Sequence, residues 1–148
     1  MAILRERIET TLSVDEAFAF VADFANAAIW DPGVASSERA NPGPVAVGAR
    51  YRLQIRMGGR LAPMAYEITA FEPGRRVVLT GSGSGVNAVD DIRFDPTPTG
   101  TRITYVADIR LQGLRRLAEP FARGTFARIA SDARDGMQRT LDQRAARA

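Results

Sequence analysis

The sequence contains no cysteine, no histidine and no lysine, and all twenty of its basic residues are arginine. Without cysteine, the protein has no disulfide, no thiolate nucleophile and no zinc–thiolate site. Without histidine, it lacks the commonest metal ligand and the side chain whose ordinary pKa lies nearest neutrality. The lack of lysine excludes Schiff-base chemistry, and arginine serves poorly as a base. We therefore expect no metal site and no cofactor.

Long hydrophobic runs are also missing. No stretch approaches the roughly eighteen apolar residues that a membrane-spanning helix needs, and the amino terminus lacks a cationic segment followed by an apolar one. We therefore expect a cytoplasmic protein with no membrane span. The 148 residues fit one domain, 1–148, which is large enough to bury a core without disulfides or metals.

Neither sign of charge is in large excess. The isoelectric point is about 10.1, yet the net charge is only +3, because seventeen carboxylates are interspersed with the arginines. The high isoelectric point reflects the use of arginine in place of lysine and the lack of histidine. We therefore expect no nucleic-acid partner.

The chain begins with a strand-like segment and two short helical segments. Residues 3–12 carry apolar side chains at alternate positions, interrupted by Glu6 and Thr10, which predicts a strand at a sheet edge. Residues 13–16 have the pattern of a capping box and predict the start of a helix. A second short helix is expected over residues 23–29, before Pro32 and Gly33 end it.

From residue 34 onward the apolar pattern repeats every two residues. Residues 49–57 alternate an apolar face with an arginine-rich face, as expected for a half-buried strand. Further strands are predicted over residues 60–71, 75–81, 86–95 and 101–111; in the first of these, Met64, Tyr66, Ile68 and Ala70 share a face. The segment Gly81–Gly85 is interpreted as a flexible hairpin connection and not a phosphate loop, because a strand follows it.

Beyond the last strand the pattern becomes helical. One long amphipathic helix is predicted from Pro120, preceded by a short helical piece around residues 114–119. Its apolar stripe is thin in the middle, where small residues such as Ala133 occur. Glycine inside a helix costs about 1 kcal/mol relative to alanine, so Gly124 and Gly136 indicate either a close neighbour or open space. A sheet wrapped around so slim a helix leaves room for a ligand pocket.

Several turn and packing motifs follow one another along nearly the whole chain: Ser13-Val14-Asp15-Glu16-Ala17-Phe18, Asp23 followed by Trp30-Asp31-Pro32, Gly48 before a strand, Phe71-Glu72-Pro73-Gly74-Arg75-Arg76, Phe94-Asp95-Pro96, and Gly100-Thr101-Arg102-Ile103-Thr104-Tyr105. In this order they resemble the START-like, or SRPBCC, superfamily, and most of all its bacterial polyketide cyclase/dehydrase-type members. The resemblance implies an α+β helix-grip fold: a curved antiparallel sheet of about seven strands wrapped around a long C-terminal helix, with two short helices after the first strand. It also implies a hydrophobic cavity. Members bind lipids, sterols, polyketides, hormones or flavonoids, and some catalyse cyclisation or dehydration.

A set of side chains is expected to face this cavity and contact a ligand. By strand alternation and helical spacing they are Trp30, Tyr51, Leu53, Ile55, Met64, Tyr66, Ile68, Leu79, Asp90, Ile92, Ile103, Tyr105, Ile109, Phe126, Ile129 and Met137. Ordinary core packing is the alternative for nearly all of them, because slipping a strand by one residue reverses its face.

Asp90 is the sharpest candidate for catalysis, because it shares its predicted face with Ile92 and Phe94. Burying an unpaired carboxylate is costly, so Asp90 should either find a donor or titrate with a raised pKa. A bulge, or a position near the rim, would instead leave Asp90 in water. Tyr66 or Tyr105 could act with it as an acid/base pair, or orient a ligand carbonyl.

Three classes of function remain open at this point. The first is binding of a hydrophobic small molecule of lipid, polyketide or aromatic type, by a monomer or a homodimer. The second is a cyclase or dehydratase that uses Asp90 with Tyr66 or Tyr105. The third is a protein or ribonucleoprotein interaction module that uses the opposite sheet face, which carries Arg50, Arg52, Arg56, Arg93, Arg102 and Arg110. Acidic residues share that face, so cross-strand pairing is the favoured explanation of the arginines.

Overall fold

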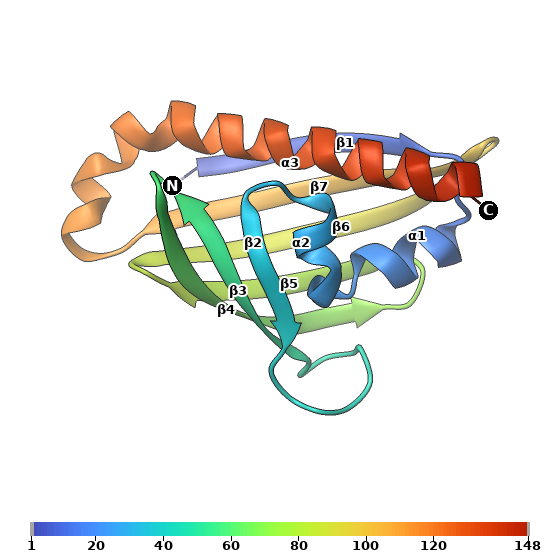
Figure 1. Cartoon of the computed structure of the whole chain (residues 1–148), viewed down its shortest axis with the longest axis horizontal. Helices are drawn as coiled ribbons and strands as arrows, with labels where there is room; N and C mark the ends of the chain where they lie inside the picture. Colours follow the sequence, from blue (N-terminus) through green and yellow to red (C-terminus); the bar gives the residue numbers. More distant parts are fainter. Residues whose placement is uncertain (1, 148) are drawn as a thin grey trace.

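The computed structural model describes residues 2–147, which form one antiparallel sheet and a set of helices on its concave face (Figure 1). The strands lie in the order β1-β7-β6-β5-β4-β3-β2, so β1 is an edge strand, as predicted. Their bounds are β1 (Ala2–Thr10), β2 (Val34–Arg39), β3 (Arg50–Met57), β4 (Arg60–Glu72), β5 (Arg76–Gly83), β6 (Val86–Thr97) and β7 (Gly100–Leu111).

The helices cover two parts of the same face. The long helix α3 (Glu119–Arg147) runs across the sheet beside β1, and the 3-10 helix η2 (Gly113–Ala118) connects it to β7. Three short helices after β1 lie over the other part: α1 (Val14–Val21), η1 (Phe24–Asn26) and α2 (Ala27–Trp30). This is the helix-grip arrangement that the family resemblance implied. No helix in the described chain is long and apolar enough to span a bilayer.

The start of α1 shows how closely local sequence determines a helix end. The Ser13 hydroxyl accepts a hydrogen bond from the Glu16 backbone N–H at 3.2 Å, which satisfies one of the free donors of the first turn. The Glu16 carboxylate accepts from the same hydroxyl at 2.9 Å. The carboxylate therefore completes the cap through the serine side chain, where a standard capping box uses the serine amide.

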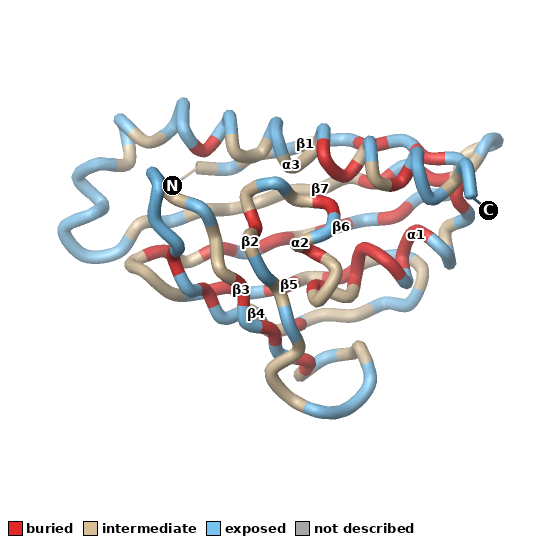
Figure 2. The backbone as a smooth tube through the Cα atoms, viewed as in Figure 1, coloured by how far each residue is buried: buried red, intermediate tan, exposed pale blue. Residues whose placement is uncertain are grey.

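The alternation of side chains along the strands determines which face of the sheet forms the core. In β3, Tyr51 and Leu53 are buried while Arg50 and Arg52 are exposed, because successive side chains of a strand point to opposite faces. Figure 2 shows buried residues recurring along the strands and along the carboxy-terminal half of α3, while η2 and the beginning of α3 are exposed. The core therefore lies between the concave face and the helices.

Two local predictions required correction. The pairing of β4 with β5 shifts between Ile68 and Ala70. This β-bulge reverses the alternation, so Phe71 and not Ala70 turns inward, and its ring packs 5.3 Å from that of Phe18. The connection predicted over residues 81–85 is also shorter than expected, because β5 continues to Gly83.

Candidate functional site

A cavity of about 150 Å³ lies between the concave face of the sheet and α3. Side chains from β1, β3, β4, β6, β7 and α3, together with the segment after α2, form its wall. Most of this wall is aliphatic or aromatic. Leu4, Met57 and Ile129 in the wall are only half-buried, so the cavity opens to solvent between the β3–β4 hairpin and α3.

The cavity exists because α3 presents small side chains to it. Ala130 and Ala133 face the space between Phe126 and Met137, where larger side chains would fill it. Farther along the helix, a Cβ atom on Gly136 would collide with the Trp30 carbonyl oxygen. Gly136 therefore allows the end of α2 to approach α3 closely, and Trp30 and Asp31 at this end of α2 both line the cavity. Gly124 has no neighbour at its Cβ position, so only one of the two helix glycines serves close approach.

Asp90 on β6 is buried at the cavity wall, with 6% of its surface exposed. Its Oδ2 accepts a hydrogen bond from the Tyr105 hydroxyl at 2.5 Å. Burial raises the pKa of Asp90 to about 7; the hydrogen bond from Tyr105 acts against this rise, and the nearby Asp31 carboxylate adds to it. The structure therefore excludes the solvent-exposed alternative for this side chain.

Asp31 is a second carboxyl group at the cavity and follows directly after α2. Burial raises its pKa to about 6, although its Oδ1 accepts a hydrogen bond from the Gly33 backbone N–H at 2.8 Å, which favours the ionised form. The negative charge of Asp132 contributes to the rise. Two carboxyl groups thus share one cavity, and the charge of Asp31 adds to the raised pKa of Asp90.

Aromatic side chains surround these carboxyl groups. The Tyr66 ring lies against Gly81, where a Cβ atom would come within 2.5 Å of it, and the Trp30 and Tyr105 rings meet edge to face at 6.0 Å. Burial raises the pKa values of Tyr66 and Tyr105 well above the ordinary range, so both hydroxyls remain protonated donors. The Trp30 Nε1 donor is buried and has no hydrogen-bond partner within residues 2–147.

The structure brings many of the predicted ligand-contacting side chains together at the cavity: Trp30, Ile55, Met64, Tyr66, Asp90, Tyr105, Ile109, Phe126, Ile129 and Met137. Their contact with a ligand remains a prediction. The others are buried in the core away from the cavity: Tyr51, Leu53, Ile68, Leu79, Ile92 and Ile103. These six are not part of the cavity wall; phenylalanines of α1 cover part of the concave face, where Phe18, for example, packs 5.0 Å from Phe94. Their contact with a ligand also stays a prediction.

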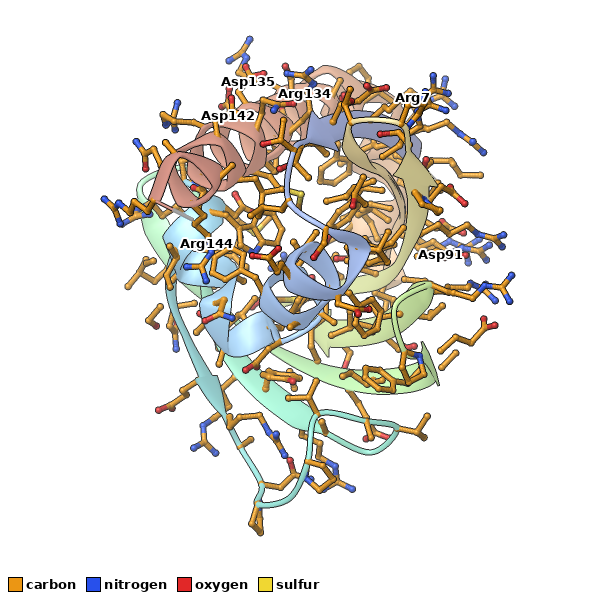
Figure 3. The ribbon with its side chains drawn as sticks, turned by 90° about the vertical axis from the view of Figure 1, so that its right-hand side faces the viewer. Arg7, Asp91, Arg134, Asp135, Asp142 and Arg144 are labelled. Atoms are coloured by element: carbon orange, nitrogen blue, oxygen red, sulfur yellow. The ribbon has the colours of Figure 1, made fainter. Side chains whose placement is uncertain are left out.

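Sequence reasoning missed three charged residues at the cavity: Glu6, Asp31 and Arg134. Glu6 shares the inward parity of Leu4 and Ile8, so strand alternation alone places it at the cavity, although its charge interrupts the apolar pattern. Asp31 belongs to the motif Trp30-Asp31-Pro32, which was interpreted as a turn. Arg134 lies beside Ala133 on α3, and Figure 3 shows it next to Asp135, with which it forms an ion pair at 3.0 Å.

The arginines of the outer sheet face are largely paired with acidic residues across strands. Arg50 lies 3.1 Å from Glu67, and Arg102 lies 3.0 Å from Glu9. Arg76 forms two hydrogen bonds with Asp91, and Figure 3 shows Asp91 on the outer side of the sheet. This confirms the predicted cross-strand pairing. No group of acidic side chains in the described residues is arranged to hold a metal ion.

Comparison with known proteins agrees with this geometry. The sequence model of the family described as polyketide cyclase/dehydrase and lipid transport matches residues 1–147. A protein from Thermus thermophilus has the same fold with a TM-score of 0.80 and 13% identity, covering 99% of each chain. The Zhui aromatase/cyclase from a Streptomyces species has a TM-score of 0.78 and 13% sequence identity, and the match covers 98% of this chain and 93% of that one. A START superfamily protein from Mycobacterium smegmatis has a TM-score of 0.76 and 12% sequence identity, and the match covers 99% of each chain. No curated protein matches the sequence.

Proposed function

Because the chain belongs to the polyketide cyclase/dehydrase and lipid transport family, we propose that it binds an apolar small molecule in the cavity between α3 and the sheet. One observation carries this proposal: a space of about 150 Å³ with a mainly apolar wall and a few polar groups. An apolar cavity of this size holds a molecule such as benzene, and the open end lets a longer ligand extend toward solvent. Aliphatic walls with few convergent polar groups are typical of ligand sites.

The proposal can be tested by filling the cavity. Ala133→Phe places a ring in the space, whereas Ala127→Phe makes the same change at an exposed position of α3. We use 4-phenylbutanol as a neutral apolar probe. The only tryptophan of the chain, Trp30, lies in the cavity wall, so its fluorescence reports occupancy directly. We expect at least tenfold weaker binding by Ala133→Phe and unchanged binding by Ala127→Phe. Equal binding by both variants and the wild type would contradict the proposal.

A second candidate function, acid–base catalysis, is favoured by the chemistry of Asp90. A carboxyl group with a pKa of about 7 can both accept and return a proton at neutral pH. Asp90 would remove a proton from the carbon next to a ligand carbonyl, and the protonated Tyr66 hydroxyl would donate a hydrogen bond to the enolate oxygen that forms. Tyr105 would act as a positioning residue through its hydrogen bond to Asp90. The reaction class is that of the enolisation steps in cyclisation and dehydration.

Enolisation can be measured without knowing the natural substrate. In D₂O, the protein would accelerate exchange of deuterium into the carbon next to the carbonyl of 4-phenyl-2-butanone, followed by NMR. Asp90→Asn should abolish the acceleration while retaining affinity for 4-phenylbutanol. If Asp90→Asn exchanges as fast as the wild type, this second function is wrong and the binding function is unaffected.

A further inference from the structure

The cavity has an acidic character that binding an apolar molecule does not require. Three carboxyl side chains reach it from three different elements: Glu6 from β1, Asp31 from the end of α2 and Asp90 from β6. Among the described residues, the wall contains one cationic side chain, Arg134, whose guanidinium already lies 3.0 Å from Asp135. We propose that the cavity selects an apolar ligand that carries a protonated amine. This rests on the proposed binding function and specifies its ligand class.

The Asp90 carboxyl group has an unused acceptor. Its Oδ2 accepts from Tyr105, whereas its Oδ1 has no hydrogen-bond partner in the described chain. A carboxylate can accept several hydrogen bonds, and an ammonium group supplies three donors. A buried carboxylate is costly unless it is paired. An ammonium ion at Oδ1 would donate the missing hydrogen bond and would also supply the positive charge that pairs with the carboxylate.

The aromatic side chains beside the carboxyl groups favour a cation as well. Trp30 and Tyr105 lie edge to face at 6.0 Å, and Tyr66 and Phe126 also line the cavity. The faces of aromatic rings attract ammonium ions, most strongly those of tryptophan, and the attraction increases when water is excluded. The remainder of the ligand would pack against the aliphatic wall toward Ala133.

Other ligand charges fit this site less well. A ligand carboxylate would face Glu6, Asp31 and Asp90, while Arg134, the cation that the described residues contribute to the wall, is already paired with Asp135. A neutral ligand would leave Asp90 either protonated or unpaired. A bare metal ion is not expected, because no group of acidic side chains in the described residues could hold one. An organic cation needs only one close carboxylate and tolerates the others at longer range.

The proposal predicts a specific pH dependence. The groups that interact with Asp90 are Asp31, Tyr66 and Tyr105, with Glu6 and Arg134 elsewhere on the wall. The tyrosines do not titrate near neutrality, and burial raises the pKa of Asp90 to about 7. Below that pH Asp90 is protonated and attracts an ammonium ion weakly; above it, the carboxylate attracts it strongly. Affinity for an amine should therefore rise from pH 6 to pH 8, and affinity for an alcohol should not.

The experiment compares three probes with similar skeletons by calorimetry: 4-phenylbutylammonium, 4-phenylbutanol and 4-phenylbutyrate. At pH 8 we expect the ammonium ion to bind at least tenfold more tightly than the alcohol, because a hydrogen bond to a charged group increases affinity by about tenfold or more. The carboxylate should bind most weakly. At pH 6 binding of the ammonium ion should be weaker and should release a proton to the buffer.

Two adjacent aspartates provide a matched pair of variants. Asp90→Asn should remove the advantage of the ammonium ion over the alcohol and its pH dependence. Asp91→Asn makes the same change on the outer face, where the side chain pairs with Arg76, and should leave all three affinities unchanged. If Asp90→Asn does not fold, the comparison of probes across pH in the wild type is decisive alone.

The outcomes separate this inference from the function on which it rests. If the alcohol binds as tightly as the ammonium ion, or if the carboxylate binds best, the amine selectivity is wrong and apolar-ligand binding stands. If the wild type binds the three probes in the expected order but Asp90→Asn binds them in the same order, Asp90 is not the recognition group and the inference also fails. If no probe binds at either pH, the proposed function itself is contradicted.

Discussion

At the scale of single residues, neighbouring positions of one strand give the same amino acid opposite properties. Asp90 points into the cavity wall and burial raises its pKa to about 7. Asp91 points outward, and its hydrogen bonds with Arg76 lower its pKa. The two side chains differ in environment only because successive residues of β6 face opposite sides of the sheet.

The raised pKa of Asp90 makes stability depend on pH. Its ordinary value is 3.8, so between about pH 4 and pH 7 the folded state retains a proton that the unfolded state releases. Stability therefore falls as pH rises through this range and is level above it. Asp90→Asn should become more stable relative to the wild type from pH 4 to pH 8, by up to about 4 kcal/mol. Urea unfolding at several pH values measures this difference.

Asp91→Asn provides the control, because a lowered pKa makes stability change with pH in the opposite direction. The ionised Asp91 stabilises the folded state above its ordinary pKa, and this stabilisation is lost as pH falls through the lowered value. Asp91→Asn should thus be destabilising at pH 8 and nearly neutral in strong acid. A difference between Asp90→Asn and the wild type that stays constant with pH would contradict burial of an ionisable carboxyl group.

At the scale of elements, the position of α3 relative to α2 shapes the site. Gly136 lies against the Trp30 carbonyl and within 2.8 Å of Pro32 at its Cβ position, so backbone and side chain meet without room for a methyl group. Trp30 and Asp31, the last residue of α2 and the one after it, both line the cavity. The contact at Gly136 therefore holds two site residues in place.

Gly136→Ala should disturb both folding and binding. The added methyl group meets backbone atoms that cannot rotate away, so we expect destabilisation of about 1–3 kcal/mol and weaker binding of 4-phenylbutanol. Gly124→Ala is the matched control on the same helix, where the Cβ position is open, and it should stabilise the protein by up to about 1 kcal/mol. Thermal unfolding and Trp30 fluorescence distinguish the two; equal effects would show that the close approach is not needed.

At the scale of the whole molecule, the charge of the outer sheet face is largely balanced by ion pairs. The net charge is +3 despite twenty arginines, and arginines of the outer sheet face form ion pairs such as Arg52–Glu38 at 3.1 Å. Exposed pairs contribute little to stability. Their main consequence is that the outer face offers little unbalanced positive charge to an anionic partner.

The protein should therefore bind nucleic acid weakly or not at all. Binding to phosphate depends on cations that displace counterions, and arginines already paired with carboxylates displace few. We expect no binding to a labelled DNA duplex or RNA hairpin at physiological salt, measured by fluorescence anisotropy. Tight binding that weakens steeply with added salt would instead support the ribonucleoprotein alternative.

Much of the architecture was predictable because it depends on local periodicity. Alternation every two residues in β3, β6 and β7 and the capping pattern before α1 each reflect interactions among residues close in sequence. The thin stripe around Ala133 also correctly indicated open space beneath α3. Where prediction failed locally, as at the bulge between Ile68 and Ala70, a single extra residue reversed the alternation without a distinct signal in the composition.

Local patterns along the chain were enough to predict most of the strands, the helices, the inward face of most strands and the family resemblance. Which inward residues meet empty space depended on how distant segments pack together. Phe94 and Asp90 both face inward from β6, yet the first is buried against Phe18, 5.0 Å away, and the second lines the cavity. The difference arises because one part of the sheet is covered by bulky residues of α1 and the other by the small residues of α3. Alternation specifies a direction for each side chain, but a cavity depends on what lies opposite, and residues far apart in the sequence supply that.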